Sequence, residues 1–528
     1  MRKILVPLLI VVSTLTLSAQ TPTTLDLLKQ AQAAIAQAIA NLTSAPTPTT
    51  ITVAVGGDVQ GALNTVPCGG TVAFASGVTY TGNYTFPNKS CGSMTVTVTT
   101  GGLTMPSGRV SPTLAASFAK FTSANASPTF SFQNGSHDWI LRGLEVKAGA
   151  GLYPLGLITI GVGDTTQTTL AQAPMHVTID QCYIHGDPTT GAKFGVSLNG
   201  GDLTITNSYL SDIKGKGQDA QALVGTNGPG PFLIQNNYLE AAGENVLFGG
   251  DDPKIPGLIP TGIVVTNNLF SKQLSWKGQG WNIKNDLEFK NAQNAHVFGN
   301  IFENSFVANQ SGFLLMVTPR NQSGGCPWCT VQNVEIDHNV GRHAYSWVNI
   351  LGLDDTKDSS GVVRPSVRVQ GINIHDNLAY DIGTATYGTG TSFGVAVNNG
   401  PVNVSIIHNT LAGTTSEFLT LTLGVSGVLP VNLQYTCDVV PEGSYGIAGS
   451  TTVGTPSWTA GVDPTSGFDY NAILPGGLRK IVYPGSHTRL GAYTFDTTYT
   501  MTPALICADG KPAGADIPAV VTATGVTF

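Results

Sequence analysis

A concentration of lysines is the first feature of this chain that points to chemistry. Lys272, Lys277, Lys284 and Lys290 place four basic residues within 19 positions, whereas the whole chain of 528 residues has 25. The local density of positive charge is therefore about four times the average for the chain. Ammonium groups pair with carboxylates, so such a cluster suits an acidic polymer. We predict that Lys277 and Lys284 belong to a substrate-binding surface.

Carboxylates accompany these lysines. In the segment DLEFK (286–290), alternation along a strand turns Leu287 and Phe289 to one side and Asp286, Glu288 and Lys290 to the other. Removal of a proton beside a sugar carboxylate requires a base and a group that neutralises that carboxylate, while further carboxylates can hold calcium. The pattern predicts a β-elimination site. The groups expected beside it, at the ends of adjacent strands, are Asp251, Asp252 and Arg320.

An internal repeat supplies the elements that would position these groups. Eight short segments each combine alternating apolar residues with a polar turn, the pattern of a strand and its end. Their sixth residues are separated by 26, 29, 31, 32, 39, 38 and 32 positions, so a constant unit alternates with loops of variable length. The segments are VTIDQCYI (177–184), LTITNSYL (203–210), FLIQNNYL (232–239), IVVTNNLF (263–270), AHVFGNIF (295–302), VEIDHNVG (334–341), INIHDNLA (372–379) and VSIIHNTL (404–411).

The sixth position of the repeat is asparagine in six of the eight copies. Stacked parallel strands place equivalent residues about 4.8 Å apart, a distance over which each side-chain amide can bond to the next. We expect an asparagine ladder whose members also adopt left-handed turn geometry. Cys182 occupies the first of these positions and is expected to be a buried, unreactive thiol.

With these repeats the chain resembles the right-handed parallel β-helix proteins of the pectate-lyase-like superfamily. The resemblance covers roughly Ile51 to the C terminus, and residues 57–87 are similar to the capping helix and first coil of that group. It implies an all-β fold: a single-stranded right-handed parallel β-helix, a solenoid of roughly ten to twelve coils with an N-terminal capping helix. We predict this β-helix over residues 51–430, followed by irregular C-terminal coils and a cap over 431–528.

The same resemblance extends to the chemistry. A strand with an acid two residues before a lysine, followed by an arginine on the next coil, is similar in arrangement to calcium-assisted alginate and dermatan lyases of this fold, which use a lysine and an arginine. It implies that Lys290 is the base, that Arg320 holds the sugar carboxylate, and that Glu288, Asp251 and Asp252 are calcium ligands. The sequence thus predicts a polysaccharide lyase that cleaves a uronate-containing polymer by β-elimination.

Two other functions remain open. The run Gly250-Asp251-Asp252 invites comparison with polygalacturonases, inverting glycoside hydrolases of the same fold whose carboxylates lie about 6.5 to 9.5 Å apart. Their accompanying Asn-Thr-Asp, Gly-His-Gly and Arg-Ile-Lys elements are not found in the chain. A noncatalytic glycan-binding adhesin or matrix fibre would use the same surface without chemistry. Products with an unsaturated sugar end distinguish the lyase from both alternatives.

Seven cysteines predict three disulfides and one free thiol in an exported protein. The motif Cys326-Pro-Trp-Cys329 lacks the βαβ context of a redox protein, so we expect it to staple the loop after Arg320 and to offer Trp328 for stacking on a sugar ring. The sequence alone leaves the pairing open, and the pairs that we predict are Cys68–Cys91, Cys326–Cys329 and Cys437–Cys507.

The N-terminal residues predict export. Residues 1–19 combine a basic start, an apolar run and small residues at the end, which is the pattern of a signal peptide. No later stretch has the length of a membrane span, so we expect an extracellular or periplasmic protein. Residues 20–50 read as a helical segment and a Thr/Pro linker, and the helical stripe allows an oligomer to form through it.

The overall composition excludes several classes of protein. Charged residues make up 11% of the chain, against roughly 25% in ordinary domains, which argues against coiled coils and charge-rich disorder. The formal net charge of −7 disfavours a nucleic-acid partner. An acidic polysaccharide must therefore bind through a local basic patch.

Overall fold

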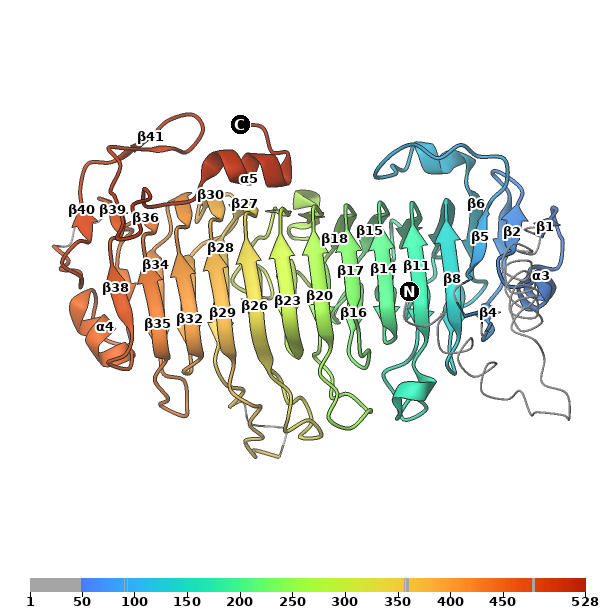
Figure 1. Ribbon diagram of the computed structural model, residues 1–528, viewed down its shortest axis with the longest axis horizontal. Helices are drawn as coiled ribbons and strands as arrows, with labels where there is room; N and C mark the ends of the chain where they lie inside the picture. The colour runs from blue at the N-terminus through green and yellow to red at the C-terminus, as the bar shows by residue number, and fades with distance from the viewer. Residues whose placement is uncertain (1–48, 90, 93, 356, 358–359, 477–479) are drawn as a thin grey trace, which may run out of the picture. The chain divides into compact units, whose positions relative to one another are not determined.

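The computed structural model describes residues 49–89, 91–92, 94–355, 357, 360–476 and 480–528 (Figure 1). Residues 1–49 and Thr50–Phe528 form separate units. The predicted signal peptide, and the helical segment with its linker up to residue 48, lie outside the described residues. Within the described ranges, none of the helices has the length and apolar character needed to cross a membrane.

The unit Thr50–Phe528 is built from three long parallel sheets, which we call sheets A, B and C. Sheets A and B each have 14 strands and sheet C has 12. From β5 to β39, neighbouring strands in a sheet are three apart in sequence order, because each circuit of the chain adds one strand to every sheet. Figure 1 shows sheet A face-on, from β2 to β38. This is the architecture of a parallel β-helix, as the repeats predict.

The strands of each sheet follow in spatial order. Sheet A contains β1 (Thr50–Val53), β2 (Thr71–Phe74), β5 (Val96–Thr100), β8 (His137–Arg142), β11 (Met175–Asp180), β14 (Gly201–Thr206), β17 (Phe232–Gln235), β20 (Thr261–Thr266), β23 (Ala292–Phe298), β26 (Val331–Asp337), β29 (Gln370–His375), β32 (Val402–Ile407), β35 (Val431–Thr436) and β38 (Gly467–Asp469). Sheet B contains β3 (Thr79–Thr81), β6 (Ala119–Thr122), β9 (Leu144–Lys147), β12 (Tyr183–His185), β15 (Tyr209–Ile213), β18 (Tyr238–Ala241), β21 (Leu269–Ser271), β24 (Ile301–Glu303), β27 (Val340–Ala344), β30 (Leu378–Ile382), β33 (Thr410–Gly413), β36 (Val439–Pro441), β39 (Ala472–Leu474) and β40 (Arg489–Leu490). Sheet C contains β4 (Tyr84–Phe86), β7 (Phe130–Phe132), β10 (Ile158–Ile160), β13 (Phe194–Leu198), β16 (Gln221–Gly225), β19 (Val246–Phe248), β22 (Leu287–Phe289), β25 (Phe313–Val317), β28 (Ser346–Leu351), β31 (Phe393–Asn398), β34 (Glu417–Thr422) and β37 (Gly446–Ala448).

The eight repeats are the sheet A strands β11 to β32 together with the sheet B strands that follow them. The strand expected within DLEFK (286–290) is likewise β22 of sheet C. Regular pairing nevertheless continues through β35, β36, β38 and β39, so the boundary expected at residue 430 falls inside the solenoid. Beyond that position the sequence becomes rich in Gly, Pro and Tyr, which hides the alternation that marks the earlier strands.

The register stacks like residues into columns. In sheet C, every second side chain faces the core, and the intervening side chains face outward. Leu287 and Phe289 of β22 point inward and are 1% exposed. One continuous core column consists of Val196, Leu223, Val246, Leu287, Leu315 and Val348.

A row of buried asparagines follows sheet A along the turn into sheet B. Asn237 Nδ2 donates to Asn268 Oδ1 at 3.0 Å, and Asn268 makes the same bond to Asn300. The row continues with the same geometry through Asn339, Asn377 and Asn409. The left-handed residue of each turn is the one before the asparagine, such as Asn236 with a φ of 54° and Asn267 with 56°. Left-handed geometry thus falls one position earlier than expected, because the asparagine itself must turn inward to reach its neighbour. Cys182, at the start of the row, is a free and buried thiol.

Helices and loops cover the remaining surfaces of the solenoid. Helix α3 (Val59–Thr65) begins at Asp58, which accepts a hydrogen bond from the Gly61 N–H at 2.8 Å, and it buries Val59, Ala62 and Leu63. Helix α5 (Ile517–Thr524) lies near β27 and β30 in Figure 1, where Ile517 and Val520 join an apolar cluster. The other helices are α4 (Thr455–Gly461), η1 (Leu114–Ser117), η2 (Leu170–Gln172) and η3 (Leu274–Trp276), and β41 (Thr494–Phe495) and β42 (Met501–Thr502) form a separate antiparallel pair.

Three disulfides link cysteines that are near in sequence or near in the fold. The pairs are Cys68–Cys91, Cys326–Cys329 and Cys437–Cys507.

Candidate functional site

The outer face of sheet C carries a groove of about 500 Å³. Its floor follows one outward column, in which Thr159, Ser197, Val224 and Leu247 are register neighbours on successive coils. Lys290 lies at one end. A groove that spans several coils and stays open to solvent suits a chain-like ligand better than a small enclosed one. Polar and charged residues at its rim include Asp164, Lys193, Asp219, Gln221 and Asp251.

Lys290 and Glu288 form the centre of the candidate site. Glu288 continues the floor column after Leu247 and is 1% exposed. The Lys290 Nζ lies 3.5 Å from Glu288 Oε1, and the Thr318 hydroxyl donates to the same carboxylate. Because Glu288 is enclosed while the Lys290 side chain is 19% exposed, the ammonium group is the part that a ligand in the groove can reach.

A second buried carboxylate, Glu244, lies beside this pair. Its Oε1 is 3.4 Å from Lys284 Nζ, and its Oε2 accepts a hydrogen bond from Gln221 Nε2 at 2.5 Å. Lys284 also pairs with Asp219 at the rim of the groove. The site therefore contains two ammonium groups, Lys284 and Lys290, held against two enclosed glutamates.

The two glutamates have opposite pKa shifts although both are buried. Burial raises the pKa of Glu288, and burial together with the charge of Glu244 outweighs the opposing effects of Lys290, Thr318 and Lys284. Burial acts on Glu244 in the same direction, but Lys284, Lys290 and the hydrogen bond from Gln221 outweigh it and lower its pKa. Burial lowers the pKa of Lys284, but Glu244 and Asp219 raise it by more, so the pKa lies above its ordinary value. Divergent pKa values in neighbouring acids are typical of functional sites.

Arg320 lies on the coil next to Lys290. The Arg320 N–H donates to the Lys290 carbonyl at 3.0 Å. Its guanidinium turns toward other groups: Nε donates to Gln322 Oε1 at 2.9 Å and Nη1 lies 3.3 Å from Asp354 Oδ1. A sugar carboxylate would have to displace Asp354 in order to bind this guanidinium.

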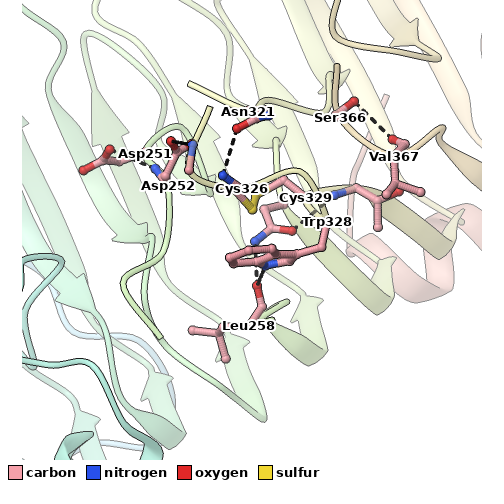
Figure 2. Close-up of a disulfide and its surroundings, with 12 residues drawn as sticks. Asp251, Asp252, Leu258, Asn321, Cys326, Trp328, Cys329, Ser366 and Val367 are labelled. Carbon is pink, nitrogen blue, oxygen red and sulfur yellow. Dashed lines mark hydrogen bonds between the residues drawn. A yellow bond between two sulfur atoms is a disulfide. The ribbon is translucent and has the colours of Figure 1, made fainter. Parts of the chain in front are cut away.

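Asp251 and Asp252 have different environments. Asp251 lines the groove and its side chain is 52% exposed. Asp252 is buried, and its Oδ2 accepts the N–H groups of Ser323 at 2.9 Å and Gly325 at 2.8 Å. Figure 2 shows Asp252 beside the loop that carries Cys326. Asp252 therefore positions the loop after Arg320.

The predicted calcium ligands are not gathered into one site. Among the described residues, three groups of His, Cys, Asp or Glu bring three ligand atoms within 4.8 Å of one another, and none of them contains Glu288, Asp251 or Asp252. Glu288 holds Lys290, and Asp252 holds backbone N–H groups. This set does not fit a calcium ion, which requires about six to eight converging oxygens.

Trp328 lies on the loop closed by the Cys326–Cys329 disulfide (Figure 2). Its Nε1 donates to the Leu258 carbonyl at 3.1 Å, and its side chain is half-buried against that neighbouring loop. Trp328 is not among the residues that line the groove over sheet C.

The lysines that are close in sequence separate in the fold. Lys272 is fully enclosed at the turn from sheet B to sheet C, 3.4 Å from Asp286, so neither of these residues faces the groove. Lys277 donates to the Thr386 carbonyl at 2.6 Å and lies beside the ring of Phe306. Only Lys284 and Lys290 of the four reach the candidate site, because the intervening segment 272–284 crosses a corner of the solenoid.

Sequence reasoning overlooked Gln221, Glu244 and Thr318. Two of them carried a usable signal: Gln221 and Glu244 stand two residues before the core residues Leu223 and Val246, which are register partners. Aligning the sheet C strands on their core residues would have stacked them. The pairing of Asp219 with Lys284 is not visible in the sequence.

Neither the protein-family models nor the curated protein sequences include a match to this chain. Among solved structures, it is similar to AlyGC, a PL6 family alginate lyase, with a TM-score of 0.50 and 12% identity over 91% of this chain and 58% of the lyase. It thus spans little more than half the length of that enzyme. A variant of AlyGC gives a TM-score of 0.47, 12% identity, and 89% and 58% coverage. PfbA, a surface adhesin of Streptococcus pneumoniae, gives 0.36, 10%, and 87% and 93%. From the likeness to AlyGC and from its three parallel sheets, the chain has a parallel β-helix fold.

Proposed function

We propose that the protein is an exported polysaccharide lyase that cleaves an acidic, uronate-containing polymer by β-elimination. The observation that carries the proposal is the pairing of Lys284 and Lys290 with the buried Glu244 and Glu288, where Lys290 lines an open groove. Solved structures of similar fold include a PL6 family alginate lyase, which supports a polysaccharide as the substrate class. Export follows from the signal-peptide pattern and makes the location extracellular or periplasmic.

In this proposal Lys290 is the base. In its neutral form it takes the proton from the carbon next to the uronate carboxylate, and the electron pair forms a carbon–carbon double bond. The glycosidic C–O bond on the following carbon breaks, and the departing oxygen receives a proton, for which the newly protonated Lys290 is available. Glu288 lies against Lys290, and Thr318 donates a hydrogen bond to Glu288. Together these two residues position the amine over the groove floor.

Positive charge must neutralise the sugar carboxylate during proton removal. We assign this task to Arg320, which has to exchange Asp354 for the substrate, with Lys284 as a neighbouring cation. Substrate binding by Lys277 and Trp328 stays a prediction. Their side chains contact Thr386 and Leu258, so they would act only on a polymer that extends beyond the groove over sheet C.

Calcium stays a prediction as well, although its predicted ligands do not converge. Lys290 already lies against Glu288, and Lys284 lies against Glu244, where a metal ion would compete with both ammonium groups. We therefore propose that Arg320 and the Lys284 ammonium group supply the charge compensation.

Two rivals make different predictions. An inverting hydrolase needs two carboxylates that reach the sugar. Of the predicted pair, Asp251 is 52% exposed, whereas Asp252 is 4% exposed and accepts backbone N–H groups. A noncatalytic adhesin or matrix fibre would bind glycan through the same groove without cleavage.

Incubation of the mature protein with pectate, alginate and glycosaminoglycan separates the three functions. A lyase produces new ultraviolet absorbance from unsaturated ends, a hydrolase produces reducing ends without that absorbance, and an adhesin produces neither. Absence of the absorbance with every uronate polymer, together with retained binding, would reject the lyase.

A further inference from the structure

The outer face of sheet A carries a cluster of histidines and carboxylates that the proposed lyase site does not use. His296 of β23 is the register partner of Glu335 on β26, and Asp337 of β26 is the partner of His375 on β29. These three strands are adjacent in Figure 1. Since side chains two apart on a strand share a face, Glu335 and Asp337 point the same way. Three successive coils therefore present four potential metal ligands side by side.

The ligand atoms lie at short range. His375 Nε2 is 3.1 Å from Glu335 Oε1, and His296 Nε2 is 2.6 Å from Asp337 Oδ1. The ligand atoms of Glu335, Asp337 and His375 all lie within 4.8 Å of one another. The side chains of Glu335 and His375 are 50% and 24% exposed, so an ion can enter from solvent.

The carboxylate of Asp376 orients the ring of His375. Its Nδ1 lies 2.9 Å from Asp376 Oδ2, which leaves Nε2 directed at Glu335. A carboxylate on the far nitrogen is the usual support of a histidine that binds a metal, because it fixes the ring and raises the basicity of the ligand nitrogen. His338 Nδ1 supports Asp337 in a similar way, 2.7 Å from Oδ2.

We infer that this cluster is a site for a divalent transition metal, with Zn²⁺ as the ion that its ligands suit. Glu335, Asp337 and His375 are the three protein ligands, whereas His296 contacts Asp337 from outside this group. One imidazole and two carboxylates match the borderline preference of Zn²⁺, and the carboxylate charges balance the ion. Calcium is disfavoured because it takes oxygen ligands in larger number.

The chain contains a second cluster of this kind, and it differs in one respect. Asp138, between His137 and His176, is 2% exposed, and its oxygens accept bonds from both histidines and from the Cys91 N–H at 2.9 Å. A metal would have to break that backbone bond. Glu335 and Asp337, in contrast, contact histidine side chains, and a metal ion can replace these contacts.

The test is a titration of the mature, tag-free protein with Zn²⁺ alone, followed by calorimetry and by competition with a chromophoric chelator. We expect saturation at about one equivalent for this site, and Co²⁺ in place of Zn²⁺ should give the visible absorption of a four-coordinate ion. Asp376→Asn should weaken binding by about 10- to 100-fold while leaving all ligands in place. Asn also tolerates the backbone of position 376, where φ is 52°.

His375→Ala should weaken binding further. The matched control is His487→Ala, which removes a histidine that pairs with Asp469 at 2.8 Å elsewhere on the solenoid and should leave affinity unchanged. The inference is overturned if Zn²⁺ fails to saturate, or if Asp376→Asn and His375→Ala bind it as tightly as the parent. Loss of binding in His487→Ala alone would equally place the metal elsewhere.

Discussion

Lys290 and Arg320 are joined through their backbones, with the Arg320 N–H donating to the Lys290 carbonyl at 3.0 Å across adjacent coils. Two residues that are 30 positions apart in the chain are thus neighbours on adjacent coils. Their side chains nevertheless diverge, because Lys290 lies against Glu288 and Arg320 lies near Asp354. Sheet register fixes which residues are neighbours, and the local charges decide where each side chain points.

Replacement of Lys290 distinguishes its proposed role as the base from a role as a positive charge alone. Lys290→Ala should lower kcat by about 10² to 10⁴-fold, the range for loss of a general base. Lys290→Arg keeps the positive charge but cannot give up a proton near neutral pH, so it should be similarly inactive. Rates are measured as the appearance of unsaturated ends.

Lys254→Ala is the matched control, because Lys254 is a partly exposed lysine 3.9 Å from Asp251. It should retain full activity and unfold at the same temperature as the parent. An active Lys290→Arg enzyme would show that Lys290 binds substrate and that another group removes the proton.

Arg320→Ala tests the proposed carboxylate clamp. If Arg320 neutralises the uronate in the transition state, kcat/KM falls by about 10- to 100-fold, and Arg320→Lys restores part of the loss because charge returns without the bidentate geometry. Unchanged kinetics would leave Arg320 as a partner of Asp354 only. Steady-state rates on the preferred polymer measure the difference.

Removal of divalent metals tests whether ammonium groups replace calcium. Dialysis against a chelator should leave lyase activity unchanged, whereas Lys284→Met should reduce it, because the charge beside Glu244 is then lost. Activity that disappears with chelator and returns with calcium would establish the metal instead.

The stacked asparagines should make a large contribution to stability. Asn300 Oδ1 accepts bonds from the Asn268 N–H and side-chain amide, and its own amide donates to Val265 and Asn339. Asn300→Ala leaves these enclosed groups unpaired, so the free energy of unfolding should fall by about 2 to 4 kcal/mol. Asn64→Ala, on the exposed side of α3, should change it by no more than about 0.5 kcal/mol. Equal effects of the two changes in denaturant unfolding would contradict this role.

Glu145 should make stability depend on acid pH. Burial raises its pKa, but hydrogen bonds from His185 and Lys120 outweigh this and lower it from 4.5 to about 2. Since the folded pKa lies below the unfolded one, the stabilisation is present above the unfolded pKa and disappears as the pH falls toward the folded value. Glu145→Gln should therefore cost about 2 kcal/mol at neutral pH, less than the full shift implies because Lys120 is partly exposed, and almost nothing near pH 2. Unfolding midpoints measured across this range check it, and a constant difference would exclude the ion pairs.

The fold was predictable because its signal is repeated. The alternating apolar residues mark the inward face of each strand, and the asparagine marks the turn that follows. Because the pattern recurs in eight copies, it can be recognised although the loops between the copies vary in length. The strands before β11 lack the asparagine. After β35 Asp438 takes its place, and its Oδ1 still accepts from the Asn409 N–H at 2.7 Å. After β38 the asparagine returns as Asn471, whose Oδ1 accepts from the Asp438 N–H at 3.0 Å. The sequence marker is thus interrupted where the hydrogen-bonded column is not.

The site was less predictable because it depends on stacking across coils. Lys290 and Glu288 share one strand, and their proximity follows from alternation. Glu244 and Lys284 come together only because β19 and β22 pair with a particular register. Asp286 shows the limit of alternation alone: it shares parity with Glu288, but at the start of β22 the chain is still turning, and Asp286 is enclosed beside Lys272.

The order of the sheets also bears on how such a surface changes over evolutionary time. Since every turn of the solenoid rests on the one before it, a tandem duplication or loss of one turn preserves the packing of all the others. For the proposed lyase, the number of sugar units that the face can span is therefore adjustable separately from the handful of side chains that react, and proteins of different length can share one chemistry.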